Sequence, residues 1–164
     1  CVGYNYLVRE FVKSISPGDV VIVGNDWRQG SIKKISNNQK KVYEKLARAV
    51  IDRDGHFILL DDVPGVGDPS MAMKQWYRPF PSKKIPIDTI NTMQIDLDKI
   101  GDHISEISTL SHYLPLRHLL CEKKFCGFEK NGILLYFNNG HITAEASELL
   151  SEPIKKYMYS IGIR

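Results

Sequence analysis

The fold of this chain is decided by two apolar runs, Asp19-Val-Val-Ile-Val-Gly24 and His56-Phe-Ile-Leu-Leu60, and by the segment between them. The first run is continuous, rich in β-branched residues and bounded by glycine. Such runs are typical of strands buried on both faces of a parallel sheet. We therefore predict two strands of a parallel sheet at residues 19–24 and 56–60.

The segment between the two runs has the spacing of an amphipathic helix. Asn37 or Asn38 can cap this helix, and Gly55 follows as its stop. A strand, a helix and a strand in this order form a right-handed crossover unit and predict a doubly wound α/β sheet, whose ligands bind beyond the carboxyl ends of the strands. The inward face of the helix is predicted to carry Val42, Leu46, Ala49 and Val50.

Helical spacing recurs in residues 4–15, in residues 89–110 and in a terminal helix that Thr143 can cap. Between them, residues 61–86 are too rich in proline and glycine for regular elements, and long loops of this kind are often functional. One more short apolar run, residues 133–137, is predicted to be a strand.

Composition places the chain among globular proteins. Its 164 residues are 43% hydrophobic and 25% charged, which suits a single α/β domain over residues 1–164. The longest apolar runs are far shorter than the roughly 20 residues that cross a bilayer. The net charge of +3 comes from 22 basic residues interleaved with 19 acidic ones, so we expect no nucleic-acid partner. No leader sequence follows Cys1, and we expect the chain to be a fragment.

Cysteine and glycine patterns give no support for a metal or a cofactor, and we expect neither. Cys121 and Cys126 enclose four residues, a gap that a zinc site can use, but no second Cys or His pair follows at finger-like spacing. A local disulfide is the better interpretation and would require an oxidising compartment, although three cysteines alone do not settle that compartment. Gly65 and Gly67 lack the third glycine and the following helix of a phosphate-binding loop.

Among the five histidines, His141 is the best candidate for chemistry. It lies in Asn138-Asn-Gly-His-Ile-Thr143, a turn between a predicted strand and a helix cap, where a side chain projects from the loop face. The others open a strand, lie on a helix or flank a proline, and we interpret them as surface or packing residues: His56, His103, His112 and His118.

Three segments near the end of the chain carry a family resemblance: Cys121-Glu-Lys-Lys-Phe-Cys126, Leu134-Leu-Tyr-Phe-Asn-Asn-Gly-His-Ile-Thr143 and Ala146-Ser-Glu-Leu-Leu150. In order and spacing they resemble the end of the SGNH hydrolase domain that is fused to acyltransferase family three membrane proteins. Residues 18–27 and 46–64 resemble the family with less specificity. The resemblance implies a three-layer, doubly wound, mostly parallel α/β sheet, here without its N-terminal strand and nucleophile block.

The resemblance also implies catalytic roles. In SGNH enzymes a serine from a Gly-Asp-Ser block attacks an ester, a histidine takes its proton, and an aspartate three residues earlier holds the ring. His141 would be the general base and position 138 its partner. That position is Asn138, whose amide can accept the imidazole N–H but adds no negative charge. No Gly-Asp-Ser block occurs in the chain, so we expect the nucleophile upstream of Cys1.

Two residues after the first predicted strand are further candidates. Asn25 resembles the oxyanion-hole asparagine of a Gly-x-Asn-Asp block. Gly24 directly precedes it here, however, and a simple turn would explain the same residues. Trp27 could stack on a sugar or pack against the fold.

The function implied by the resemblance is that of an O-acyltransferase or carbohydrate esterase, which moves acetyl groups to or from hydroxyls of a cell-surface polysaccharide. Its partners would be that glycan and a fused transmembrane acyltransferase module. It would lie on the periplasmic or extracellular face of the membrane, in agreement with a disulfide between Cys121 and Cys126. Asn138 and the missing serine block favour an alternative, a degenerate domain that binds or positions carbohydrate. A third possibility, a cytosolic α/β module, would leave both cysteines as free thiols.

Overall fold

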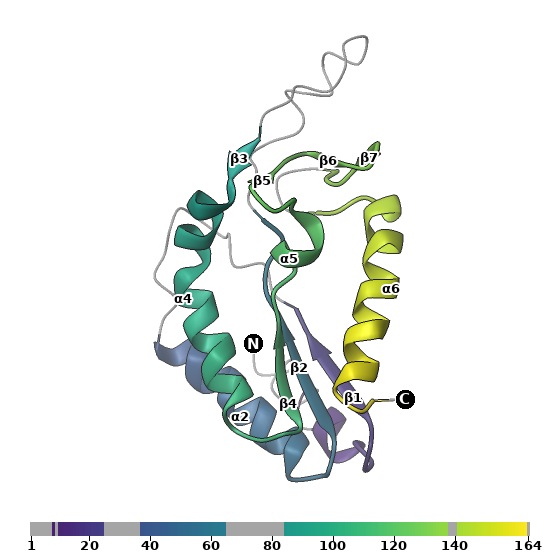
Figure 1. Ribbon diagram of the computed structural model, residues 1–164. Coiled ribbons are helices and arrows are strands. Elements are labelled where there is room, and N and C mark those ends of the chain that lie inside the picture. The colour runs from purple at the N-terminus through teal and green to yellow at the C-terminus, as the bar shows by residue number, and fades with distance from the viewer. Residues whose placement is uncertain (1–7, 9, 25–36, 65–83, 138–140, 164) are drawn as a thin grey trace. The chain divides into compact units, whose positions relative to one another are not determined.

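The computed structural model describes residues 8, 10–24, 37–64, 84–137 and 141–163 (Figure 1). The chain divides into two compact units. We call the first the sheet unit, which comprises Cys1–Asn25, Lys33–Asp61 and Asp96–Leu114. The second is the C-terminal unit, which comprises Asp26–Ile32, Asp62–Ile95 and Pro115–Arg164. The long helix α4, Ile87–Ser105, contributes residues to both units.

The sheet unit contains a three-stranded sheet in the order β1-β2-β4. Its strands are β1 (Val20–Val23), β2 (His56–Leu60) and β4 (Ser111–Leu114). The central strand β2 runs parallel to both neighbours, with Val20 opposite His56 and Phe57 opposite Ser111. The predicted strands at residues 19–24 and 56–60 and the α/β fold class are therefore confirmed.

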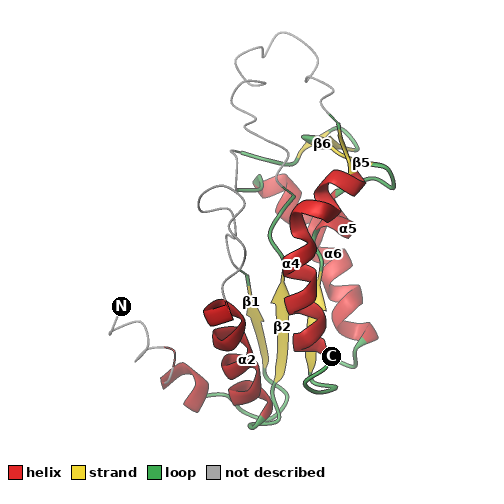
Figure 2. Ribbon diagram, turned by 90° about the vertical axis from the view of Figure 1, so that its left-hand side faces the viewer, coloured by secondary structure: helices red, strands yellow, loops and turns green. Residues whose placement is uncertain are grey.

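Two helices supply the apolar residues that cover one face of this sheet, α2 (Asn37–Ile51) and the sheet-unit part of α4; Figure 2 shows α2 alongside the strands. Side chains alternate between the faces of a strand, so Phe57 and Leu59 of β2 enter the same core. The buried core of the unit consists of Ile15, Val21, Ala47, Val50, Phe57, Leu59, Ile100 and Ile104. Residues 10–13 are helical, in agreement with the predicted first helix, whose beginning lies outside the described residues.

The inward face of α2 differs from the prediction at two positions, Val42 and Ala49, neither of which packs into the core. Val42 is 61% exposed, whereas Ala47 is fully buried. Tyr43, Leu46, Ala47 and Val50 form one stripe at three- and four-residue spacing, and this stripe packs into the core. Val42 is hydrophobic and was predicted to face inward, but its position on the helix lies outside this stripe.

Strand β1 also differs from the prediction, because it is not buried on both faces. Val21 faces the core and is buried, whereas Ile22 is 45% exposed. Among the described strands β1 pairs only with β2, so it is an edge strand of the described sheet. Ile22 points to the face opposite the core.

Gly55 does not stop α2 in the predicted way. The helix ends at Ile51, and it is Asp54 that adopts the left-handed conformation, with φ of 56°. A Cβ on Gly55 would lie 3.0 Å from Ile15 Cγ2 and 3.0 Å from Val50 Cγ1. The glycine is therefore required by close packing and not by a helix cap.

Helix α4 ends at Ser105, five residues before the predicted end at Leu110. The hydroxyl of Ser111 donates to the Ile104 carbonyl at 2.7 Å and accepts from the Ser108 N–H at 3.1 Å. The Ile104 carbonyl also accepts from the Ile107 N–H at 3.1 Å, so these bonds fix the turn that follows α4. They also lead the chain into β4, a strand that the sequence analysis did not predict.

The C-terminal unit is built from short elements. Strand β3 (Ile85–Pro86) pairs with β5 (Phe125–Cys126), and β6 (Glu129–Lys130) pairs with β7 (Ile133–Leu134), both antiparallel. The predicted strand over residues 133–137 is thus shorter than expected. Its helices are the one-turn α5 (Arg117–Leu120) and the terminal α6 (Ala144–Ser160). No helix in the described part of the chain is long and apolar enough to span a membrane.

Candidate functional site

His141 lies on a short ribbon of backbone in the C-terminal unit. Tyr136 and Ile142 form an antiparallel bridge. On one side of this bridge the Phe137 N–H donates to the His141 carbonyl at 2.8 Å. On the other side a second bond, 3.0 Å long, joins the N–H of residue 143 to the carbonyl of residue 135. We call residues 135–137 and 141–143 the His141 ribbon.

The side chains of the ribbon tip divide between protein and solvent. Tyr136 is only 1% exposed, whereas Phe137 is 65% exposed and His141 is also exposed. Phe137 and His141 oppose each other across the ribbon and therefore leave it on the same side. The imidazole of His141 is thus presented at the surface, as a general base that meets an external substrate must be.

Thr143 attaches the ribbon to helix α6. Its hydroxyl accepts from the Ala146 N–H at 3.1 Å, which makes it the N-cap, and it donates to the Leu134 carbonyl at 2.6 Å. The predicted cap is confirmed. An N-cap hydroxyl contributes about 1 kcal/mol to stability. Because the same group also holds the end of β7, it restricts where His141, two residues earlier, can lie.

The positions of the other predicted site residues relative to His141 are not described by the structure. Asn138, Asn25 and Trp27 all lie outside the described residues. Their predicted roles as orienting partner, oxyanion-hole donor and sugar platform therefore remain predictions.

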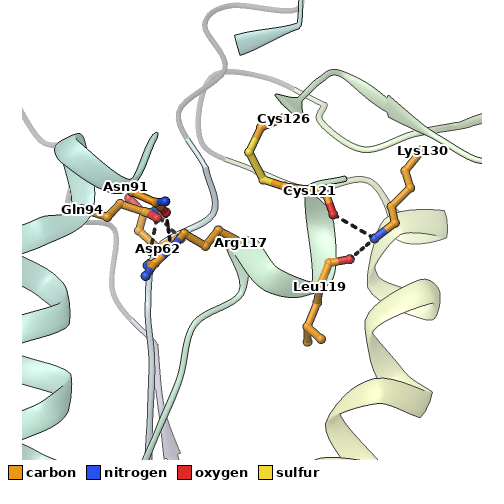
Figure 3. Close-up of a disulfide and its surroundings, with 8 residues drawn as sticks. All are labelled: Asp62, Asn91, Gln94, Arg117, Leu119, Cys121, Cys126 and Lys130. Carbon is orange, nitrogen blue, oxygen red and sulfur yellow. Dashed lines mark hydrogen bonds between the residues drawn. A yellow bond between two sulfur atoms is a disulfide. The ribbon is translucent and has the colours of Figure 1, made fainter. Parts of the chain in front are cut away.

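A disulfide joins Cys121 to Cys126, whose Cα atoms are 4.4 Å apart (Figure 3). It closes the loop between α5 and β5. Close to it, the Lys130 ammonium donates to the carbonyls of Leu119 and Cys121. These carbonyls belong to the end of α5, where a cation is favoured by the helix dipole and by the unpaired acceptors.

A buried polar network that the sequence analysis missed lies in the same unit (Figure 3). Arg117 is only 6% exposed. Its Nε donates to Asn91 Oδ1 at 3.1 Å and its Nη1 donates to Gln94 Oε1 at 3.3 Å. Gln94 in turn donates to the Asp62 carbonyl at 3.1 Å. The network links the first turns of α4 to α5 and to the segment after β2.

Weak signals for this network exist in the sequence. Asn91 and Gln94 are three residues apart, so they share one face of the predicted helix. Asp61 and Asp62 directly follow a strand, at the carboxyl end where α/β sheets bind ligands, and both are buried. Burial of Arg117 is not visible in a linear pattern.

The sheet unit holds two histidine pairings of a different kind. The rings of His56 and His112 are stacked, with centroids 6.2 Å apart. Burial lowers the pKa of His112, and the charge of His56 lowers it further. His103 Nε2 lies 3.3 Å from Glu44 Oε2. The hydrogen bond from Arg48 is the main cause that lowers the pKa of the Glu44 carboxyl, and His103 adds to it.

Metal-ligating side chains do not gather in the part of the chain that the structure describes. Nowhere in that part do three His, Cys, Asp or Glu residues come close enough together to hold an ion.

Comparison with known proteins gives one informative finding. A protein-family model described as "SGNH domain (fused to AT3 domains)" matches residues 1–156. The comparisons with curated proteins and with solved structures gave no match.

Proposed function

The chain belongs to the SGNH domains that are fused to AT3 domains, and from that membership we propose that it acts in O-acyl transfer. The membership supports a hydrolase- or acyltransferase-like domain. The proposal goes further and names the reaction, which is movement of an acetyl group to or from a hydroxyl of a cell-surface polysaccharide. The observation that carries it is the family match over residues 1–156.

In the proposed mechanism His141 is the general base. It takes the proton from a serine hydroxyl while the serine oxygen attacks the acetyl carbonyl, and it returns that proton to the departing alcohol. It then takes the proton of the sugar hydroxyl while the sugar oxygen attacks the acetyl-serine ester, and it gives that proton to the departing serine oxygen. Exposure of His141 at the tip of the ribbon supports this role. The serine is not assigned to a residue of this chain.

Three further residues have proposed roles that rest on the family resemblance. Asn138 orients the His141 ring, and Asn25 donates to the oxyanion that forms at the acetyl carbonyl. Trp27 stacks on a sugar ring. We also propose that the domain works with a fused transmembrane acyltransferase module on the periplasmic or extracellular face of the membrane. The Cys121–Cys126 disulfide supports an oxidising compartment.

Substitutions of His141 and Asn138 in the intact natural protein test this function, with O-acetylation of the polysaccharide as the readout. His141→Ala should abolish acetylation, because the serine loses its base. His118→Ala is the matched control, since His118 is also exposed but lies on α5, and it should leave the rate unchanged. Acetylation that survives His141→Ala would overturn the assignment of the base.

Asn138→Asp should raise the rate, because a carboxylate stabilises the imidazolium that forms. In a serine protease the converse change lowers turnover by roughly 10⁴, so even partial recovery is measurable. On a His141→Ala background the same substitution should have no effect. A lower rate with His141 intact would show that the Asn138 amide has a different role.

A second candidate function is binding or positioning of carbohydrate without catalysis. It is favoured by the amide at Asn138, which adds no negative charge beside His141. It predicts that His141→Ala leaves acetylation unchanged. Under this alternative the domain would still bind the glycan, which equilibrium binding to the isolated polysaccharide would detect.

A further inference from the structure

Phe137 is an exposed aromatic residue placed directly across the ribbon from His141. The Tyr136–Ile142 bridge and the 2.8 Å bond from the Phe137 N–H to the His141 carbonyl define the register. In this register Phe137 opposes His141 as a hydrogen-bonded pair, for which the Cα atoms are about 5.5 Å apart. The phenyl ring and the imidazole are therefore neighbours.

The fold itself does not explain a phenylalanine at this position. Leu135 and Tyr136 are buried and anchor the strand. Phe137 is 65% exposed, although burial of such a ring is favourable. Its position opposite a candidate base distinguishes it from the other exposed aromatic residues of the described chain, such as Phe11 and Tyr159.

We propose that Phe137 is a saccharide-binding platform, whose ring packs against the apolar C–H face of the sugar that approaches His141. This inference rests on the proposed function and specifies how that site holds its acceptor. A sugar ring has one face rich in C–H groups and a rim of hydroxyls. With that face on Phe137, a hydroxyl on the rim lies near the neighbouring imidazole. The stacking therefore orients the reacting group.

Tyr159 provides a matched control. It is an aromatic residue of the same unit and is also 65% exposed. It lies near the end of α6, sixteen residues beyond the cap Thr143, and so is remote from the ribbon along the helix. If exposed aromatic residues in general affected glycan binding, both substitutions would have the same effect.

The kinetic test compares Phe137→Ala, Phe137→Trp and Tyr159→Ala in the intact natural protein. The acceptor is the surface polysaccharide of the producing cells after mild alkaline removal of its O-acetyl groups. Phe137→Ala should raise KM for this acceptor about tenfold, which corresponds to a loss of about 1.4 kcal/mol of binding free energy. Phe137→Trp should keep KM within twofold, and so should Tyr159→Ala. A KM unchanged by Phe137→Ala would overturn the inference.

A binding test separates this inference from the proposed reaction. The dissociation constant for the same polysaccharide is measured on His141→Ala protein, which cannot turn over, with and without Phe137→Ala. A tenfold weaker affinity that Phe137→Trp restores would support the platform even if the acyl-transfer assignment failed. Equal affinity of the two proteins would overturn it even if acyl transfer were established. Matching thermal midpoints would show that lost binding does not reflect unfolding.

Discussion

The sheet unit and the C-terminal unit are stabilised in different ways. In the sheet unit, a parallel sheet and two helices enclose an apolar core around Phe57 and Ile104. In the C-terminal unit the strands are two residues long, and specific links hold them: a disulfide, the bonds of Lys130 and the network of Arg117. Strands this short are not stable alone, and buried apolar side chains of the same unit add to these links, among them Ile90, Phe128, Leu135 and Leu150.

Gly101 illustrates how tightly the sheet unit is packed. A Cβ at this position would overlap the ring of Tyr113, whose hydroxyl donates to Asp98 Oδ1 at 2.9 Å. The candidate catalytic residue, by contrast, belongs to the C-terminal unit. It lies at the surface of that unit, while Leu135 and Tyr136 of the same ribbon are buried.

The largest expected effect comes from the core of the sheet unit. Phe57→Ala should lower the free energy of unfolding by about 4 kcal/mol, through lost burial and the cavity left behind. Hydrogen exchange followed by mass spectrometry should show lost protection in β1, β2 and β4, with α6 less affected. Val42→Ala, at an exposed position of α2, is the control and should change stability by less than about 0.5 kcal/mol. Equal loss of protection in α6 would show that the two units unfold as one.

Removal of the disulfide tests the C-terminal unit. Replacing Cys121 and Cys126 together by serine should lower stability by about 2 kcal/mol, because the bond restricts the unfolded chain. The lost protection should appear in α5 and β5 and spare β2. Separately, protein purified from its native compartment without reductant should resist thiol alkylation at both cysteines. Full labelling there would contradict both the pairing and the proposed compartment.

The smallest expected effect is the pH dependence that His112 contributes to the sheet unit. Burial and the charge of His56 hold its pKa below the usual 6.5, so the folded state binds fewer protons than the unfolded state. The free energy of unfolding should therefore fall as the pH drops below about 6.5, and it should level off once the pH is below the pKa of His112 in the folded state. His112→Gln should flatten this part of the curve, measured as urea midpoints from pH 7.5 to pH 5. His118→Gln, at an exposed position, should leave the slope as it is.

The resemblance in a linear motif was sufficient to identify the family. It was not sufficient to predict the register of the His141 ribbon. The segment around His141 identified the SGNH domain, which the family match over residues 1–156 confirms. The same segment contains Phe137, but its relation to His141 depends on which residues pair across the turn. The sequence analysis placed His141 in a turn after a strand over residues 133–137 and did not predict that Phe137 and His141 face each other.

By itself, the sequence determined the elements whose signals are local. The apolar runs specified β1 and β2, the hydroxyl of Thr143 specified the start of α6, and these were predictable because strand propensity and helix capping depend on near neighbours. Tertiary structure alone decided that Ala47 and not Val42 enters the core, that the polar segment Ser111–Leu114 becomes a strand, and that Arg117 is buried. Each of these depends on a partner distant in the chain. Packing against that partner overrides local preference, because burial and hydrogen bonding across the fold are worth more than the propensity of one residue.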